Sequence, residues 1–390
     1  MGSSLQDSTV ARPVQVLHVY KDYFPDTQGG LEETIRQVCL NTEQAGFRHR
    51  IFSLSPDPDP PVIHFPEADL YRFRQCCEIA SCEFSVEGVQ GFRKLVEWAD
   101  LVHYHYPWPF GDLLHFLARV RKPSLVSYQS DIVRQKLLLR LYRPLQRRFL
   151  ASMDAVVASS PNYVRSSRVL SELKGKVVVI PNGLDASCYP EVTTEVVGRV
   201  KERYGEDFFL FVGVLRYYKG LRFLLEAARN QPFRVVIAGR GPLASRLHRQ
   251  ATALGLDNVE FTGYVDDGTK LALLQSCRAV VFPSHQRSEA FGMTLLEGAM
   301  LGKPLICAEI GTGTTYINQH METGLVVRPA NPEDLRQAMN RLMADDHLCR
   351  RLGQGARKRY EQLFTGRVMG KRFVKLYRRI VEGADEGDAL

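Results

Sequence analysis

VVFPSHQRSEAFGMTLLEGAMLGKPLIC, residues 280–307, is the stretch that decides the fold class. A short apolar run ends at Pro283, and a second one begins after Leu301 and Gly302. The residues between the two runs predict a crossover helix that joins two parallel, buried strands. The loop 284–291 then lies at the carboxyl end of a strand, which is where open α/β sheets bind ligands.

Two glutamates in this stretch are hard to explain by packing. Glu289 lies in the predicted loop, and Glu297 lies about one turn into a helix that starts near Gly292, Met293 and Thr294. Free N–H groups at a helix start bind anions, and Gly292 leaves room for a phosphate. A carboxylate there repels a phosphate unless it accepts hydroxyl groups, so we interpret both glutamates as sugar-hydroxyl acceptors. The alternative is the ordinary preference of helix starts for glutamate.

The pattern Glu-x7-Glu, together with Phe291 and the tetrapeptide LLEG at 295–298, resembles the signature of retaining glycosyltransferase family 4. The resemblance covers nearly the whole chain. It implies the GT-B fold, in which two Rossmann-like, doubly wound α/β domains face a cleft. We expect an acceptor-binding domain over 1–187 and a nucleotide-sugar-binding domain over 188–366. In 367–390 we expect a helix that returns to the first domain and an acidic tail.

Composition narrows the function classes. The 390 residues are 45% hydrophobic and 24% charged, which describes a globular protein rather than a disordered one. The net charge of +8 favours polyanionic partners, and among these we expect nucleotide diphosphates and anionic lipid rather than nucleic acid. No apolar run approaches the ~20 residues that span a bilayer, and the first residues lack a signal-peptide order, so we expect a cytoplasmic protein.

The sequence gives little indication of a metal or a cofactor. The eight cysteines are scattered, which predicts reduced thiols rather than a zinc site. Asp57 and Asp59 imitate a metal-binding carboxylate pair, but the prolines around them favour a rigid surface turn. We therefore expect no metal and no cofactor.

The N-terminal half predicts several site residues at the carboxyl ends of strands. Gly29 and Gly30 follow the strand 14–20 and form a turn where backbone can approach a ligand, without the Gly-x-Gly-x-x-Gly spacing of a dinucleotide site. His103 and His105 alternate along a strand and share a face. The family resemblance implies that His105 lies beside the donor sugar, and His103 is the better candidate for a structural role.

The next strand opens onto Gln129, Ser130 and Asp131, which we expect near the acceptor. After it, the segment 134–148 alternates leucines with six basic residues and no acid. A helix here presents an apolar face and a basic face, which fits an anionic membrane surface. The alternative is a helix with its leucines in the core. Pro144 is expected to break the helix.

The second half restarts the strand–helix alternation. Arg216 and Lys219 follow the strand 208–212 and are placed to neutralise a leaving diphosphate at the Gly292 helix start. The resemblance implies the same role for them, although their spacing is tighter than in many family members. It also places the loops of Gly241 and Tyr264 at the nucleotide base.

We interpret the chain as a metal-independent retaining hexosyltransferase that uses a nucleoside-diphosphate sugar. The segments GVLRYYKGL, YQSDIVRQ and HYHYPWP are most similar to bacterial O-antigen and capsule transferases that use GDP-mannose or GDP-rhamnose. A lipid-linked glycan at the inner membrane face is then the expected acceptor, reached through peripheral contact by 134–148. The alternatives are a GT-B-like sugar-nucleotide epimerase and a nonenzymatic module that binds anionic membranes.

Overall fold

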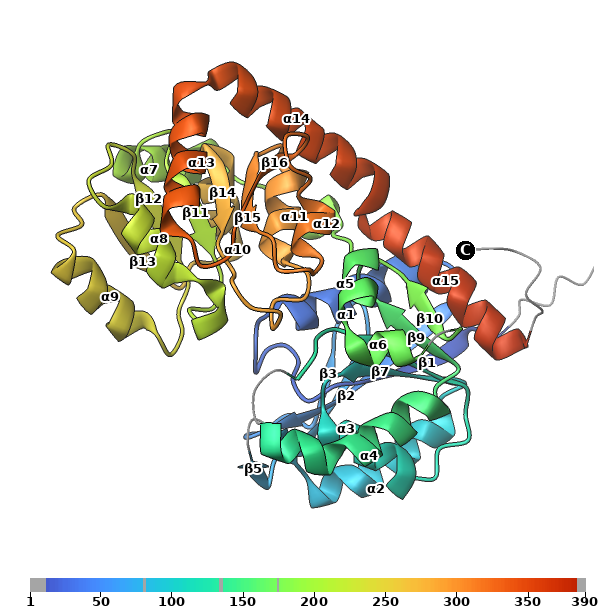
Figure 1. Ribbon diagram of the computed structural model, residues 1–390. Coiled ribbons are helices and arrows are strands. Elements are labelled where there is room, and N and C mark those ends of the chain that lie inside the picture. The colour runs from blue at the N-terminus through green and yellow to red at the C-terminus, as the bar shows by residue number, and fades with distance from the viewer. Residues whose placement is uncertain (1–11, 80–81, 133–135, 174, 384–390) are drawn as a thin grey trace, which may run out of the picture.

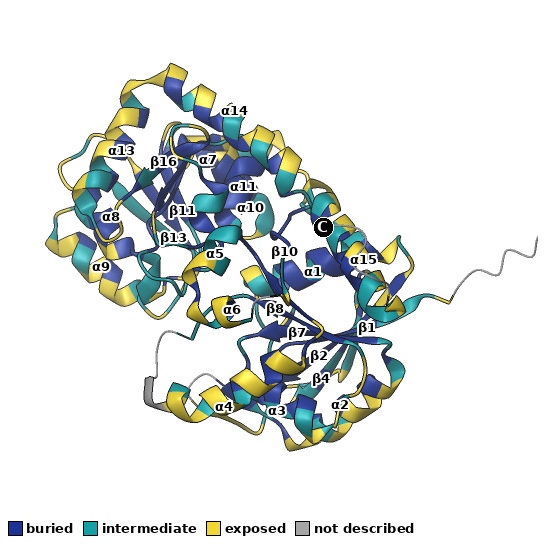
Figure 2. Ribbon diagram, turned by 45° about the vertical axis from the view of Figure 1, so that its right-hand side comes forward, coloured by how far each residue is buried: buried dark blue, intermediate teal, exposed yellow. Residues whose placement is uncertain are grey.

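The structure is a computed structural model, and it describes residues 12–79, 82–132, 136–173 and 175–383. The chain forms two α/β domains, each built on its own largely parallel sheet with helices packed against it (Figure 1). The strands at the centre of both sheets are buried, and the exposed residues gather on the outer helices (Figure 2). The predicted fold class, two Rossmann-like doubly wound domains, is confirmed.

The N-terminal sheet has the order β10-β9-β8-β7-β1-β2-β4-β3, with β3 as its antiparallel strand. Its central strands β7, β1 and β2 carry the histidines that matter below. The strands are β1 (Val14–Val19), β2 (Phe47–Ser55), β3 (Val62–His64), β4 (Asp69–Arg74), β7 (Leu101–Tyr106), β8 (Ser124–Tyr128), β9 (Ala155–Ala158) and β10 (Val177–Val179), and a separate hairpin is formed by β5 (Cys77–Ile79) and β6 (Cys82–Phe84).

Helices cover both faces of this sheet, as the right-handed crossovers between parallel strands require. Several have side-chain caps at their starts; Ser85, for example, accepts a hydrogen bond from the N–H of Gly88. The helices of this domain are α1 (Gly30–Glu43), α2 (Val86–Trp98), α3 (Pro109–Leu117), α4 (Lys136–Ser152), α5 (Pro161–Ser166) and α6 (Arg168–Glu172).

The C-terminal sheet has six parallel strands in the order β13-β12-β11-β14-β15-β16. Its central strands are short apolar runs such as VVIA and AVVF, buried at every position, which is the pattern of a sheet covered on both faces. The strands are β11 (Phe209–Val212), β12 (Val235–Ala238), β13 (Val259–Gly263), β14 (Ala279–Phe282), β15 (Leu305–Ala308) and β16 (Gly324–Val327).

The helices of the second half complete the fold and return the chain to its first domain. They are the 3₁₀ turns η1 (Ala186–Cys188) and η2 (Tyr217–Lys219), and the helices α7 (Thr194–Tyr204), α8 (Leu221–Ala228), α9 (Ala244–Ala253), α10 (Asp267–Ser276), α11 (Met293–Met300), α12 (Thr314–Ile317), α13 (Pro332–Ala344), α14 (Asp346–Leu363) and α15 (Gly366–Glu382).

The stretch 280–307 folds as predicted. Strands β14 and β15 pair in parallel, with Val280 opposite Leu305, and α11 is the crossover between them. Loop 283–292 therefore follows the carboxyl end of β14, next to β11 at the point where the strand order reverses. In α/β sheets this switch point is the position where ligands bind.

The C-terminal helix α15 leaves the second domain and packs against α1 and the first sheet (Figure 1). Phe373, Leu376 and Tyr377 are buried there in one apolar cluster with Val16 and Phe47. The two chain crossings between the domains lie side by side: Leu184 forms a parallel bridge with Thr365. The hydroxyl of Tyr360 also donates to the carbonyl of Leu184, at 2.8 Å.

The expectation that Pro144 breaks its helix is wrong, because α4 continues through it. Pro144 lies on the exposed side of the helix, where water can reach the carbonyl that loses its partner. Gln146, Phe149 and Leu150 are buried one turn further on and hold the helix against the domain core. Arg134 lies outside the described residues. In the described part of the chain, no helix is both long and apolar enough to cross a bilayer.

Candidate functional site

The start of α11 is an uncapped helix terminus shaped by a glycine. Gly292 has φ +100°, a left-handed conformation that favours glycine, and a Cβ atom there meets the side chains of Phe282 and Leu295. No side chain caps this helix start, so its N–H groups are available to an anion. The conformation of Gly292 therefore fits the anion site expected from the sequence.

The three residues around Gly292 have separate tasks. Phe291 is buried in the C-terminal core, where its ring meets Phe364 edge-on. The Thr294 hydroxyl donates to the carbonyl of Val212 at 3.1 Å and ties α11 to β11. Met293 reaches the other domain, and its sulfur accepts from the Thr34 hydroxyl at 3.8 Å. Of the three, the structure places Met293 at the domain interface and the other two in the supporting scaffold.

Glu289 is held by a lysine. Its Oε2 atom lies 2.5 Å from Nζ of Lys219 and 3.3 Å from the hydroxyl of Ser284. Only 8% of the glutamate is exposed, and a buried carboxylate needs such a partner. Both contacts use Oε2, so Oε1 has no hydrogen-bond partner among the residues that the structure describes. Glu289 therefore keeps one oxygen for a ligand.

Glu297 is arranged in the same way on the other side of the α11 start. Its Oε1 atom lies 2.7 Å from Nζ of Lys270 and accepts from the Tyr189 hydroxyl at 3.1 Å. Burial alone lowers the pKa of Lys270, but Glu297 and Asp267 outweigh it, so the pKa lies above its ordinary value and the lysine stays charged. The second oxygen, Oε2, has no partner in the described part of the chain.

Arg216 is exposed at the start of η2 and makes no ion pair with a described residue. Its charge reaches the first domain: burial raises the pKa of the Tyr20 hydroxyl, and Arg216 opposes that rise. Lys219, in contrast to Arg216, forms an ion pair with Glu289. Of the two cations predicted to act together, Lys219 is thus held by a carboxylate, and Arg216 has no carboxylate partner among the described residues.

The glycines of both domains permit close approach at the interface. A Cβ atom on Gly30 meets the side chain of Met293, and one on Gly29 meets the carboxylate of Glu32. Gly241 packs against the backbone of Leu215, which joins the loops after β11 and β12. Gly241 therefore needs a residue without a side chain, whereas at Gly29 and Gly30 a Cβ atom would meet only side chains that can move.

Tyr264 links the two domains directly. Its side chain is 55% exposed, and its hydroxyl donates to Oε1 of Gln28 at 2.9 Å. The guanidinium of Arg240 lies 5.9 Å from the centre of its ring. Tyr264 thus offers an open aromatic face at the junction of the two domains.

His105 lies in a chain of buried histidines rather than at the exposed rim. The Thr42 hydroxyl donates to the Val38 carbonyl at 2.7 Å, so it accepts from Nε2 of His49 at 2.9 Å. His49 Nδ1 then accepts from His18 Nε2 at 3.1 Å, and His18 Nδ1 accepts from His105 Nε2 at 3.0 Å. The remaining nitrogen, Nδ1 of His105, is an acceptor with no partner among the described residues.

These histidines are neutral. Burial lowers the pKa of His49 and of His105 to about 3, and burial together with the neighbouring histidines lowers that of His18 well below its ordinary value. His103 is also buried, with its two nitrogens bonded to Tyr377 and Ser127, both at 2.7 Å. It therefore joins strands β7 and β8 to helix α15.

The residues expected near the acceptor lie where the first domain meets the second. Gln129 and Ser130 are half-buried after β8. Asp131 accepts from the hydroxyls of Tyr128 and Ser167, at 2.8 and 2.7 Å. It also forms a 2.9 Å ion pair with Arg287 of the other domain. The carboxylate that the sequence suggested for the acceptor is thus engaged in a contact between the domains.

Two groups of buried side chains have metal-ligand spacing. His18 with His103 and His105 forms one, and His18 with Cys39 and His49 forms the other, with ligand atoms within 4.8 Å of one another. Both ring nitrogens of His18 already take part in the hydrogen-bond chain. The observed arrangement is therefore that of a hydrogen-bonded network.

Sequence reasoning missed the residues that hold the site together. Lys270 and Tyr189 lie far from Glu297 in the chain and have no local motif. His18 and His49 did carry a signal, because each is an ionisable residue inside a run that predicts a buried strand. Ser284 lies two residues after the end of β14, where a small polar residue is too common to be diagnostic.

The comparisons with known proteins agree with this geometry. Residues 194–359 match the family model "Glycosyl transferases group 1", and residues 29–183 match "Glycosyl transferase 4-like domain". The chain is 52% identical to D-rhamnosyltransferase WbpZ of Pseudomonas aeruginosa over 90% of its length and 92% of that protein. It is 46% identical to O-antigen chain mannosyltransferase C of Escherichia coli, over 95% and 99%.

A solved structure supports the fold. Sucrose-phosphate synthase of Thermosynechococcus elongatus superposes with a TM-score of 0.79 at 22% identity, covering 95% of this chain and all of that one. The two family models together cover both domains, and the two relatives and the solved structure each match nearly the whole chain. The chain belongs to the group 1 glycosyl transferases, enzymes of the GT-B fold.

Proposed function

We propose that this glycosyltransferase moves D-rhamnose or D-mannose from a GDP-sugar to a growing, lipid-linked cell-surface polysaccharide. The observation that carries the site assignment is the pair of lysine-held glutamates on either side of the α11 start, each with one free oxygen. The choice of sugar rests on the similarity to a D-rhamnosyltransferase and an O-antigen mannosyltransferase over nine-tenths or more of the chain. The relatives support a transferase over an epimerase or a membrane module.

In the proposed mechanism the second domain holds the donor. The N–H groups of the α11 start, Lys219 and Arg216 stabilise the charge that develops on the leaving diphosphate. Glu297 accepts the ribose hydroxyls through Oε2, and Glu289 accepts a hydroxyl of the donor sugar through Oε1. These cations supply the positive charge that a metal supplies elsewhere, so we propose that transfer continues in the presence of EDTA.

The acceptor reacts from the side of the first domain. Its hydroxyl attacks the anomeric carbon on the face that the diphosphate leaves, and a phosphate oxygen takes its proton, so the configuration is retained. The contacts Tyr264–Gln28 and Arg287–Asp131 hold the two domains together around this reaction and limit hydrolysis by water. The anomeric configuration of the product, read by NMR, tests retention.

Helix α4 supports contact with a membrane. Leu138 and Leu141 are 48% and 81% exposed, and Arg140 and Arg143 are exposed beside them. The later part of the helix packs into the core. The membrane interpretation of 134–148 therefore applies to the first part of the helix, and the interpretation as a core helix applies to the later part. We propose that the exposed leucines enter an anionic bilayer surface while the arginines meet its headgroups. Sedimentation with anionic liposomes should fall sharply in Leu138→Ser/Leu141→Ser.

The experiment that tests the donor site is thermal unfolding with a panel of nucleotides. A ligand at about 100 times its Kd adds about 2.7 kcal/mol of stability. GDP and GDP-mannose should raise the Tm more than UDP or ADP, and Glu297→Ala should remove the rise. Equal stabilisation by all nucleotides would contradict the GDP assignment, and no response to any of them would contradict the donor site.

A further inference from the structure

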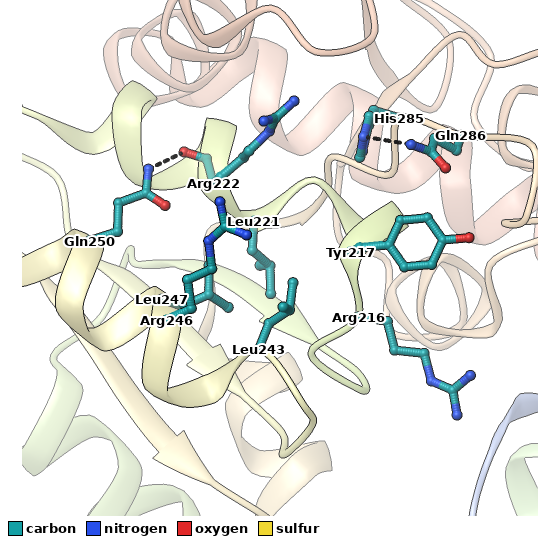
Figure 3. A pocket seen from close by; sticks show the side chains of 10 residues that line it. All are labelled: Arg216, Tyr217, Leu221, Arg222, Leu243, Arg246, Leu247, Gln250, His285 and Gln286. Carbon is teal, nitrogen blue, oxygen red and sulfur yellow. Dashed lines mark hydrogen bonds between the residues drawn. The ribbon is translucent and has the colours of Figure 1, made fainter.

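A separate basic pocket lies beside the proposed donor site, on the flank of the second domain (Figure 3). It has a volume of about 220 Å³ between α8, α9 and the loop after β14. Its floor is apolar and its rim is basic, and none of the described residues that line it is acidic. The lining residues are Arg216, Tyr217, Leu221, Arg222, Leu243, Arg246, Leu247, Gln250, His285 and Gln286.

The arginines of this pocket have no acidic partners. Arg216, Arg222 and Arg246 are exposed, and no described carboxylate lies within ion-pair distance of their guanidinium groups. By contrast, Arg278 and Arg287 of the same domain each pair with an aspartate. Unpaired positive charges on an apolar floor favour an anionic ligand, and guanidinium groups bind phosphate oxygens in bidentate fashion.

Two features of the pocket wall add to this preference for an anionic ligand. The start of α8 faces the pocket through Leu221 and Arg222, and Gly220 before it provides no side-chain cap. His285 donates from Nδ1 to the Tyr218 carbonyl at 3.1 Å, and its Nε2 atom accepts from Gln286 at 3.2 Å. Burial and the charge of Arg222 lower the pKa of His285, so the imidazole is neutral and the positive charge comes from the arginines.

The pocket joins the donor side through Arg216. This side chain extends away from the leucines, toward the side on which the first domain lies (Figure 3), and its charge acts on Tyr20 there. Glu289 and Glu297, two residues of the proposed donor site, do not line the pocket, so Arg216 is the residue that the two sites share. Its volume is below the ~300 Å³ of a typical small-molecule site, so it suits one group of a larger ligand.

We infer that this pocket binds a phosphate or diphosphate group distinct from that of the donor, and that the group belongs to the acceptor. The inference rests on the proposed function, because it assigns the acceptor a diphosphate next to its lipid. The apolar floor of Leu221, Leu243 and Leu247 then meets the first carbons of that lipid. Free inorganic pyrophosphate carries the same phosphate groups. The two measurements below distinguish it from the diphosphate of the acceptor.

The first measurement is a titration of the full-length protein with inorganic pyrophosphate while GDP saturates the donor site. The wild type should bind, and Arg222→Gln/Arg246→Gln should bind at least tenfold more weakly. Arg249→Gln is the matched control, because Arg249 is exposed on the same helix and does not line the pocket. Equal affinity in the double variant and the wild type overturns the inference, and this result does not depend on turnover.

The second measurement is steady-state transfer to a prenyl-diphosphate-linked acceptor and to the same glycan without its diphosphate. The double variant should raise KM about tenfold for the first acceptor and leave KM for the second and for the donor unchanged. Loss of pyrophosphate binding without a change in acceptor KM contradicts the acceptor assignment and identifies a free anion as the ligand. Failure of any transfer, with pyrophosphate binding intact, counts against the proposed function and not against the pocket.

Discussion

Two polar networks lie on either side of the domain interface. They differ in how they offset the free-energy cost of burying polar groups. In the second domain, Glu289 and Glu297 each form an ion pair with a lysine. In the first domain, the chain from Thr42 through His49 and His18 to His105 is fully buried and neutral. A charged pair survives near a ligand site, whereas deep in a sheet hydrogen bonds between neutral groups cost less.

Acid should therefore affect the two networks unequally, and this is the largest effect we expect. Burial keeps the pKa of His18, His49, His103 and His105 low, whereas these side chains titrate near 6.5 once unfolded. The unfolded state then binds more protons, so stability is present above about pH 6.5 and is lost as the pH falls. His49 and His105, whose pKa lies near 3 in the folded protein, each cost about 2 kcal/mol at pH 5.

Four carboxyls oppose this trend, because burial raises the pKa of Glu32, Glu33 and Glu83 as well as that of Asp112. Burial raises the pKa of Asp112 to about 8, so its contribution grows more favourable between pH 7.5 and 5. The net loss of unfolding free energy over this range is therefore smaller than the histidines alone produce. Urea unfolding at both pH values measures it, and His49→Phe should make the dependence shallower. Stability that is flat over this range would show that the histidines are protonated alike in both states.

The lysine-held network should respond in activity rather than in stability. Lys219→Met removes a charge from the leaving diphosphate and frees the Glu289 carboxylate, so kcat should fall by about 10²–10³ with little change in Tm. Single-turnover transfer measures this loss. Lys201→Met is the control, because Lys201 forms an equally short but exposed pair with Glu206. Similar losses in the two variants would contradict a special role for Lys219.

A smaller effect should distinguish the proposed role of Glu297 from that of Glu289. Lys270→Met leaves Glu297 with only the Tyr189 hydroxyl, so the ribose contact loosens and KM for the donor should rise about tenfold, while kcat changes little. Tyr189→Phe removes the other contact and should change KM only a few-fold. Initial rates over a range of donor concentrations give both constants. A fall in kcat with unchanged KM would place Glu297 at the reacting sugar instead.

The sequence predicted one of these networks far better than the other. Glu289, Glu297 and Gly292 lie within nine residues, so their relation is visible in a single strand–loop–helix pattern. The histidine chain depends on sheet order, which brings β7, β1 and β2 together from distant segments. Alternation along one strand pointed only to His103 and His105. Their partners His18 and His49 become neighbours only when the sheet forms.

Contacts between distant parts of the chain also decide the surroundings of two single residues. Asp131 follows a strand, as a ligand-binding carboxylate does, but the approach of Arg287 from the other domain engages it. Pro144 carries a strong local preference against a helix interior, yet burial of Phe149 and Leu150 holds α4 together. In both cases a contact between distant parts of the chain outweighs a correct local rule.

The side-by-side crossings at Leu184 and Thr365 have a consequence for engineering. Because α15 belongs in space to the first domain, a chimera that exchanges only the second domain needs two junctions. The bridge places those junctions next to each other, with the Leu184 carbonyl accepting from Gly366 at 2.8 Å. The second domain is thus an insertion between two adjacent points of one scaffold, and we expect that it can be exchanged between relatives as a single cassette.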